Sequence, residues 1–320
     1  MSIVELFNKK FNNNSGIDCD FSLLKYTDNV FVGRDKSGNC AMVINSSTPN
    51  HNQIMQKTKM LSLECNVSVT YNLDGKTITS TVHVLKCYSK EADEISLFLE
   101  LSILFILKGD YSEQHLLNVF RTMVNFFSIK NEPSEIELQG LFAELYAIKY
   151  FQSSLDLGKY WQSRDKLKFD FSISDTLKIE VKSTIKPERI HHFKHEQLTT
   201  NLYDIYIISF MLRYDDSGIS LFDLLIEMKN YYKNDPEHLI KILKTLRSTS
   251  KSRLISMKFE KNYIESKMKI FKAKDVPKFK QKTPSGVFNA EYDCSLENIN
   301  EISLTEFINN IKSINAQNCI

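Results

Sequence analysis

Two carboxylates and a lysine occur in one short stretch of the chain, in a pattern that suits phosphodiester hydrolysis. The stretch, residues 168–182, reads KFDFSISDTLKIEVK. Asp170 lies in an apolar segment, and Glu180 and Lys182 lie in a second apolar segment beyond a short turn. Carboxylate oxygens are preferred ligands of Mg²⁺, and a lysine beside them can position a water or stabilise a phosphorane. The stretch predicts a catalytic site that uses Mg²⁺, for which Mn²⁺ can substitute.

The two segments are expected to pair as an antiparallel hairpin about Asp175. In that register Asp170 lies opposite Glu180, and directly opposed residues have Cβ atoms about 5 Å apart. Lys182 is two residues further on and shares their face. The other face carries the residues expected in the core, Phe169, Phe171, Ile173, Ile179 and Val181. Because two opposed carboxylates repel each other, the pairing favours a cation between them.

Two residues outside the hairpin are candidates for the same site. Glu144 lies beside the apolar stripe of a predicted helix that begins at Ser134, where Glu137 completes a capping box. Gln197 lies on a helix expected over about 188–201. Glu144 is a third candidate metal ligand, and either side chain can orient a water.

A half-exposed strand explains the same hairpin residues without chemistry. Charged residues alternate along such strands, where Glu and Lys pair in solvent, and the bare spacing occurs by chance in many proteins. Asp170 between two phenylalanines favours the chemical interpretation, because Asp is depleted from strands.

The surrounding elements predict a mixed sheet flanked by helices, an α+β or α/β arrangement. From Ser134 the expected order is helix, strand, strand, strand, helix, strand, helix. Its later elements are strands at 168–173, 177–185 and 204–212 and helices at about 188–201 and 221–231. A further helix follows residue 235. We expect a core domain over 134–235 and a helical and basic extension over 236–320.

The N-terminal part of the chain has no residues arranged for chemistry. Residues 1–110 form a β-rich domain with hairpins about the turns 35–38 and 72–75. The segment 92–107 fits either a strand or a helix. A helix over 112–127 lies within a helical connector, residues 111–133. We expect the N-terminal domain to dock partners or contact substrate.

The formal charge of +2 over 320 residues means that nucleic-acid binding requires a local patch. Residues 251–282 carry eleven basic and three acidic side chains with interleaved aromatics, which suits nucleic acid and a solvated strand face equally. The candidate nucleic-acid contacts are Lys186, His192, Lys194, Lys269 and Lys272, and Arg164 is a weaker one. His191 and His195 have the spacing of a zinc-binding pair on a helix, although a helix surface explains them better.

Other features limit the protein class. The six cysteines are far apart and form no CxxC pair, which favours free thiols in a cytoplasmic protein. No signal peptide is expected, and no apolar run is long enough to cross a membrane. The sequence contains no GxxxxGK[ST] motif, so an ATP-driven step requires a partner.

The element order and the Asp…Glu-x-Lys pattern resemble the PD-(D/E)xK nuclease superfamily. The segments 140–145 (GLFAEL), Phe169–Phe171, 179–184 (IEVKST) and 195–198, together with Trp161, are similar to the bacterial "PD-(D/E)XK motif protein" family. In the resemblance Asp170, Glu180 and Lys182 take the catalytic positions, and Glu144 takes that of the acidic residue on the first core helix. Phe169 stands where the motif has proline.

The resemblance implies a restriction-endonuclease-like core and a Mg²⁺-dependent DNA endonuclease. It also implies a restriction or anti-phage defence system with a helicase-like ATPase, a MutL-like ATPase and a methyltransferase as partners. A homodimer would supply two active sites for double-strand cleavage. A non-catalytic DNA-binding or scaffold subunit is the alternative, and an RNA nuclease would share the same site chemistry.

Overall fold

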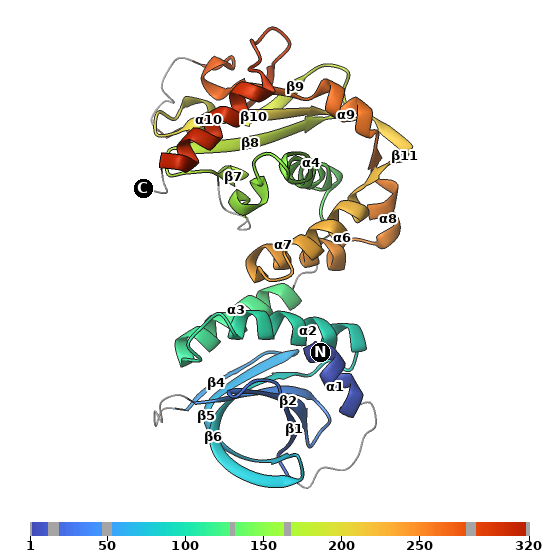
Figure 1. Cartoon of the computed structure of the whole chain (residues 1–320), viewed down its shortest axis with the longest axis vertical. Helices are drawn as coiled ribbons and strands as arrows, with labels where there is room; N and C mark the ends of the chain where they lie inside the picture. The colour runs from blue at the N-terminus through green and yellow to red at the C-terminus, as the bar shows by residue number, and fades with distance from the viewer. Residues whose placement is uncertain are drawn as a thin grey trace. The chain divides into compact units, whose positions relative to one another are not determined.

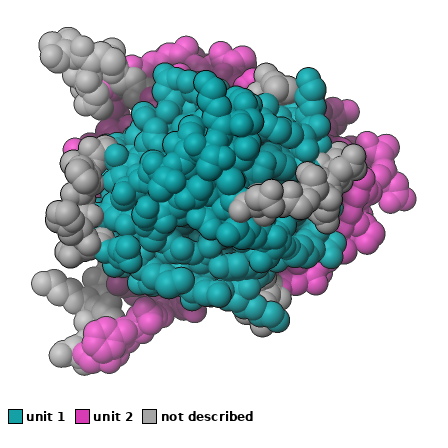
Figure 2. Space-filling model, turned by 90° about the horizontal axis from the view of Figure 1, so that it is seen from below, with its two compact units in different colours: residues 1–130, 234–236 teal, residues 131–233, 237–320 magenta. Residues whose placement is uncertain are grey.

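The computed structural model describes residues 2–11, 19–46, 53–128, 132–162, 168–279 and 286–317. The chain forms two compact units, which Figure 2 shows in different colours. One unit contains residues 1–130 with 234–236, and the other contains 131–233 with 237–320. None of the helices in the described part of the chain has the length and apolar character needed to span a membrane.

The first unit is built on a sheet whose strands close into a ring (Figure 1). The strand order is β1 (Phe21–Lys25), β2 (Val30–Asp35), β3 (Cys40–Asn45), β6 (Lys76–Cys87), β5 (Leu61–Leu73) and β4 (Ile54–Lys57). β1 also pairs in parallel with β5, which closes the ring. Both predicted hairpins are confirmed: Gly38, Asp74 and Gly75 adopt the positive φ that tight turns require.

Three helices complete the first unit, and two of them lie in segments that have a sequence-based prediction. They are α1 (Ile3–Phe11), α2 (Ala92–Ile106) and α3 (Glu113–Phe127). The ambiguous segment 92–107 is helical. The predicted helix over 112–127 is confirmed, and the Ser112 hydroxyl accepts from the His115 N–H at 3.3 Å as its N-cap. The segment expected as a connector, 111–133, contains α3, which packs against β5 and α2 inside this unit.

The second unit contains a mixed four-stranded sheet. Its strand order is β13 (Lys269–Lys272), β10 (Asp204–Met211), β8 (Leu177–Thr184) and β7 (Phe171–Ser172). β8 and β10 run parallel, and the other two pairings are antiparallel. The segment expected as a C-terminal extension, 236–320, supplies β13 to this sheet, and its residues 237–320 belong to the same compact unit.

Helix α4 (Glu135–Phe151) begins with the capping box that the sequence predicts. The Ser134 hydroxyl accepts from the Glu137 N–H at 3.2 Å, and the Glu137 carboxylate accepts from the Ser134 N–H at 2.7 Å. The other helices are α5 (His195–Thr199), α6 (Leu221–Tyr231), α7 (Pro236–Ser248), α8 (Lys251–Ser256), α9 (Lys261–Lys267) and α10 (Leu304–Gln317), with short 3₁₀ turns η1 (Leu157–Tyr160) and η2 (Ala273–Asp275). The predicted helices over 221–231 and after residue 235 are therefore confirmed.

The helix expected over 188–201 is wrong in its first half. Ile190–Lys194 form strand β9, which pairs with β14 (Glu291–Ser295), and only the following residues form the short helix α5. Buried and exposed side chains alternate along β9, with His191 and Phe193 inward and His192 outward. A two-residue period belongs to a strand. A further pairing joins β11 (Tyr214–Ser220) to β12 (Lys258–Phe259).

The four-stranded sheet separates two hydrophobic clusters, and this separation positions the candidate site. Ile179 and Val181 of β8 pack in the cluster that includes α4, α6 and α10. Phe193 of β9 and Leu198 of α5 pack in a second cluster with alternate residues of β10. Because side chains alternate along a strand, Glu180 and Lys182 face the side of β9 and α5.

Candidate active site

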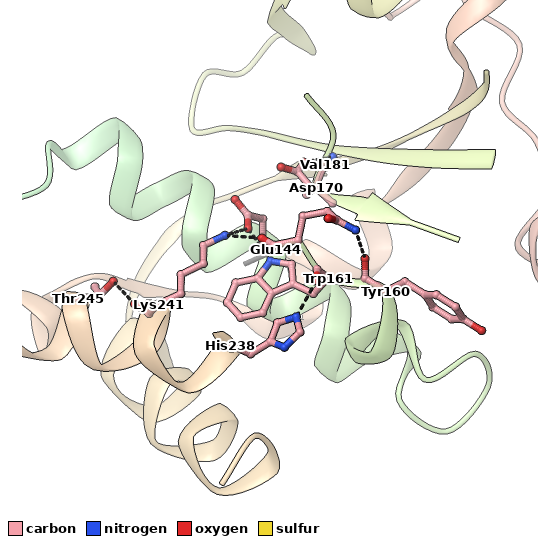
Figure 3. Close-up of polar contacts among 9 residues, drawn as sticks. Glu144, Tyr160, Trp161, Asp170, Val181, His238, Lys241 and Thr245 are labelled. Atoms are coloured by element: carbon pink, nitrogen blue, oxygen red, sulfur yellow. Dashed lines mark hydrogen bonds and ion pairs between the residues drawn. The ribbon is translucent and has the colours of Figure 1, made fainter. Parts of the chain in front are cut away.

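The hairpin that carries the motif has the predicted register. Phe171 pairs with Ile179 and Ser172 with Lys178, which is the register symmetric about Asp175. β7 begins at Phe171, so Asp170 lies immediately before the edge strand. The Val181 N–H donates to Asp170 Oδ2 at 2.7 Å and ties this carboxylate to the residue after Glu180 (Figure 3).

Glu180 is the most constrained carboxylate of the site. Its side chain is 8% exposed, and Oε1 accepts from Lys182 Nζ and Gln197 Nε2, both at 2.8 Å. Its other oxygen, Oε2, is buried and has no hydrogen-bond partner among the described residues. An unsatisfied buried carboxylate oxygen is costly, and a bound cation or water would relieve that cost.

Gln197 is held in one orientation by three hydrogen bonds. Its Nε2 donates to Glu180 and, at 3.2 Å, to the Lys168 carbonyl, while its Oε1 accepts from the Lys194 N–H at 3.1 Å. The last bond caps the start of α5. Gln197 therefore holds the Glu180 carboxylate from the side of α5. Lys182 holds the same carboxylate from within β8, and its ammonium also lies 5.2 Å from the centroid of the Phe193 ring.

Glu144 reaches the site from α4 but already has two partners. Its Oε2 accepts from Trp161 Nε1 at 2.7 Å and from Lys241 Nζ at 2.9 Å (Figure 3). Lys241 lies on α7. Figure 3 shows Asp170 beside this group, above the Glu144 side chain. The structure therefore brings Asp170, Glu180, Lys182 and Gln197 together, and the Glu144 carboxylate lies close enough to act on the charge of Asp170.

Burial and two neighbouring carboxylates raise the pKa of Asp170 well above its ordinary value. Burial contributes most, followed by the negative charges of Glu180 and Glu144, while the Val181 N–H and the Lys182 ammonium oppose the shift. Such mutual repulsion is the condition that a bound cation relieves.

The donor set fits a hard divalent cation that retains water ligands. Among the described residues, no three His, Cys, Asp or Glu side chains are grouped as a complete metal site. Glu180 Oε2 and Asp170 Oδ1 nonetheless receive no hydrogen bond from the described part of the chain. Mg²⁺ is commonly bound by one or two carboxylates, with waters and substrate phosphate completing its shell. The residues present therefore fit Mg²⁺ better than a zinc site.

The histidines do not form the helical pair that their spacing predicts, because His191 lies in β9 and His195 begins α5. His191 is buried with Nε2 2.6 Å from Ser209 Oγ, and Arg189 donates to the same hydroxyl at 2.6 Å. Burial, then the positive charges of Arg189 and Lys182, lower the pKa of His191 to about 3, so its ring is neutral.

The candidate nucleic-acid contacts lie in exposed or half-buried positions, and several are paired. Lys186 and Lys194 are exposed. His192 lies 2.9 Å from Asp293, Lys269 pairs with Glu301 at 3.3 Å, and Lys272 pairs with Glu306 at 3.2 Å. Exposed pairs are weak enough to exchange for phosphate. Arg164 lies outside the described residues.

The aromatic residues of the basic tract are not all available to stack on bases. Phe259 and Phe271 are fully buried in the two cores, whereas Phe279 is 68% exposed. A pocket of about 500 Å³ lies beside Phe279, Lys274 and Lys278, on the Leu198 side of α5. Lys278 donates to the Leu198 carbonyl at 2.7 Å, so part of the positive charge there stabilises the end of α5.

The sequence did not identify Lys241 as a residue of the site. The signal for it is weak: His238, Lys241 and Thr245 have three- and four-residue spacing, so they share one face of α7, but the same helix carries other charged residues. The His238 ring lies 2.7 Å from the Trp161 carbonyl, which places that face of α7 against the site (Figure 3). Only the three-dimensional structure shows what this polar stripe meets.

Comparison with known proteins supports the family resemblance. A protein-family model with the description "Putative PD-(D/E)XK family member, (DUF4420)" matches residues 20–297. No curated protein and no solved structure matches the chain. The matched segment contains all five residues of the candidate site and covers most of the chain. The chain therefore belongs to the DUF4420 family of PD-(D/E)XK-type proteins.

Proposed function

We propose that the protein is a Mg²⁺-dependent DNA endonuclease. The observation that carries this proposal is the Glu180 carboxylate, which is held by Lys182 and Gln197 on one oxygen, unpartnered and buried on the other, and close to Asp170. Proteins of the PD-(D/E)XK superfamily are usually nucleases and typically use divalent metals. A buried carboxylate oxygen without a partner is costly, and a bound cation would relieve that cost.

Asp170 and Glu180 would hold the ion, with Glu144 nearby as a candidate third carboxylate. When bound, Mg²⁺ (or Mn²⁺) lowers the pKa of a water and neutralises charge on the phosphate. Lys182 has its ammonium on Glu180 Oε1, where it can donate to the attacking water or to a phosphate oxygen. Gln197 holds the Glu180 carboxylate in position by donating to its Oε1.

We further propose that the protein works in a restriction or anti-phage defence system. The family resemblance supports partnership with a helicase-like ATPase, a MutL-like ATPase and a methyltransferase. Since the sequence has no GxxxxGK[ST] motif, ATP-driven steps would come from such partners. The first unit, which carries none of the candidate site residues, is then the docking module, and a homodimer would allow both DNA strands to be cut.

A non-catalytic DNA-binding or scaffold subunit is the second candidate. It is favoured by Glu144, whose Oε2 is occupied by Trp161 and Lys241 instead of facing an open metal site. In that case the fold would be retained while the chemistry is not.

Cleavage of plasmid and phage DNA separates the two candidates. Wild type with Mg²⁺ or Mn²⁺ should nick or linearise DNA, and Asp170→Ala and Lys182→Ala should each reduce the rate by at least about 100-fold. Lys86→Met, which breaks an ion pair in the first unit, is the matched control and should cleave normally. No cleavage by wild type, alone or with the products of its neighbouring genes, would favour the scaffold. Parallel assays on RNA would identify an RNA nuclease.

A further inference from the structure

A lysine ammonium is held beside the carboxylates by contacts that suit a cation. Lys241 Nζ lies 2.9 Å from Glu144 Oε2 and 3.3 Å from the Gln162 carbonyl oxygen, and 4.2 Å from the centroid of the Trp161 ring. Its side chain is 22% exposed and that of Glu144 is 18% exposed. A carboxylate, a carbonyl and an aromatic face together form a partly desolvated cation site (Figure 3).

This ammonium is fixed in place by the packing around it. Trp161 is 2% exposed, and its ring stacks against His238 at 5.6 Å between centroids and against Tyr232 at the same separation. Trp161 also donates to the Glu144 oxygen that Lys241 contacts. The Glu144 carboxylate is therefore held in a defined orientation, with its charge compensated on one oxygen.

We propose that the Lys241 ammonium acts as a tethered cation in the position that a second metal ion would take beside Glu144. The site would then hold one divalent ion, with Asp170 and Glu180 as its candidate ligands. This inference rests on the proposed function, since it concerns how the same site binds metal. It assigns Lys241 a role as a positioning residue, which holds Glu144 and limits the metal content.

The balance of formal charge supports a single ion. Three carboxylates (Asp170, Glu180, Glu144) and two ammonium groups (Lys182, Lys241) sum to −1, which one divalent ion converts to +1. A second ion would leave +3 in a partly desolvated site, more than one phosphodiester charge can offset. Two-metal nucleases place their ions about 3.5–4 Å apart on shared carboxylates. Here the Glu144 oxygen is shared with a lysine instead.

An anchoring role offers a different explanation of the same contacts. Lys241 would then join α7 to α4, and its removal would change stability without changing metal binding. Lys149 provides the comparison, because it lies on α4 and forms an ion pair with Glu227 of α6 that includes none of the three carboxylates of the candidate site. Lys149→Met should therefore show how the loss of an ordinary interhelical ion pair affects stability and metal binding.

Metal stoichiometry tests the inference. Mn²⁺ is titrated into the full-length, metal-free protein by calorimetry, and electron paramagnetic resonance of the loaded protein detects spin-coupled ion pairs. Wild type, Lys241→Arg and Lys149→Met should bind about one Mn²⁺ per chain, and Lys241→Met should bind about two and give a coupled-pair spectrum. Glu144→Gln in the Lys241→Met background should restore about one. Circular dichroism confirms that each variant is folded.

Each result has a defined meaning. Two ions in wild type, or one ion in a folded Lys241→Met, overturns the tethered-cation role and leaves the proposed nuclease function intact. If Lys241→Met does not fold, Lys241→Gln takes its place, with about two ions again expected. If wild type binds no Mn²⁺, both the inference and the metal-dependent function are overturned.

Discussion

Two half-buried Glu–Lys pairs, one in each unit, have nearly the same geometry but different surroundings. Glu64 and Lys86 of the first unit lie 2.7 Å apart, and Glu180 and Lys182 of the second lie 2.8 Å apart. All four side chains are no more than 21% exposed. Distance and burial alone therefore do not distinguish a structural pair from a candidate active site.

The two pairs differ in the groups that surround the carboxylates of Glu180 and Glu64. Glu180 has a buried oxygen with no partner among the described residues, and it raises the pKa of a second carboxyl group, Asp170. Glu64 has no such unsatisfied buried oxygen in the described part of the chain, and it pairs across the adjacent strands β5 and β6. An unfavourable arrangement that folding retains is a stronger indication of function than a favourable one.

The largest expected effect follows directly from this comparison. Glu180→Gln should reduce metal-dependent DNA cleavage by on the order of 10³-fold, because the amide replaces a charged ligand. Glu64→Gln makes the same chemical change in the first unit and should leave the rate within about twofold of wild type. The measurement is the single-turnover cleavage rate at saturating Mg²⁺. Equal losses in the two variants would mean that Glu180 has only a structural role.

A smaller effect is expected at the residue that orients Glu180. Gln197→Ala should weaken Mn²⁺ binding by about 10–100-fold, since groups that orient metal ligands typically contribute this much. Gln139 is the control: it donates to Ser183 on the same strand at 3.1 Å and makes no hydrogen bond to a carboxylate of the described residues. Gln139→Ala should bind Mn²⁺ normally in the same calorimetric titration. If both variants lose affinity alike, the effect comes from general disturbance of β8.

The hairpin and the start of α4 could be predicted from the sequence because both depend on local rules. A two-residue alternation fixes the register about Asp175, and the Ser134 capping box marks a helix start. The segment 190–194 was harder, because His, Phe and Lys do not distinguish a helix from a strand, and its partner β14 lies about 100 residues later.

The rest of the site depends on contacts between distant parts of the chain. Lys241 is 97 residues from Glu144, and no local pattern connects them. β13 joins the sheet through its pairing with β10, although the sequence of that region indicates only a basic tract. Tertiary packing decides such placements, so the sequence predicted the carboxylates but not the cation that accompanies Glu144.

The smallest expected effect concerns stability, and it should have opposite signs in the two units. Asp170 has a raised pKa, so the folded state binds more protons than the unfolded state and loses stability as pH rises above the ordinary value of 3.8. Asp170→Asn keeps an oxygen for the Val181 N–H and removes the charge. It should therefore raise the free energy of unfolding of the metal-free protein at pH 7.

Asp20 in the first unit provides the opposite case. The Thr70 N–H and then Lys36 lower its pKa, so it stabilises the folded state above pH 3.8 and loses that contribution as pH falls. Asp20→Asn should slightly destabilise the protein at pH 7, with the effect reduced by the 46% exposure of this side chain.

Urea unfolding in EDTA between pH 4 and 8 tests both signs. Fluorescence of Trp161, the only tryptophan of the chain, reports the second unit, and circular dichroism reports both units. The advantage of Asp170→Asn over wild type should shrink as pH falls towards the ordinary value of 3.8, because Asp170 of the wild type then becomes protonated in the unfolded state as well as in the folded state. An advantage that does not change with pH, or a loss of stability at pH 7, would show that Asp170 is not held among repelling carboxylates. The strongest reason for placing a metal ion at this site, and not at the Glu64–Lys86 pair, would then be removed.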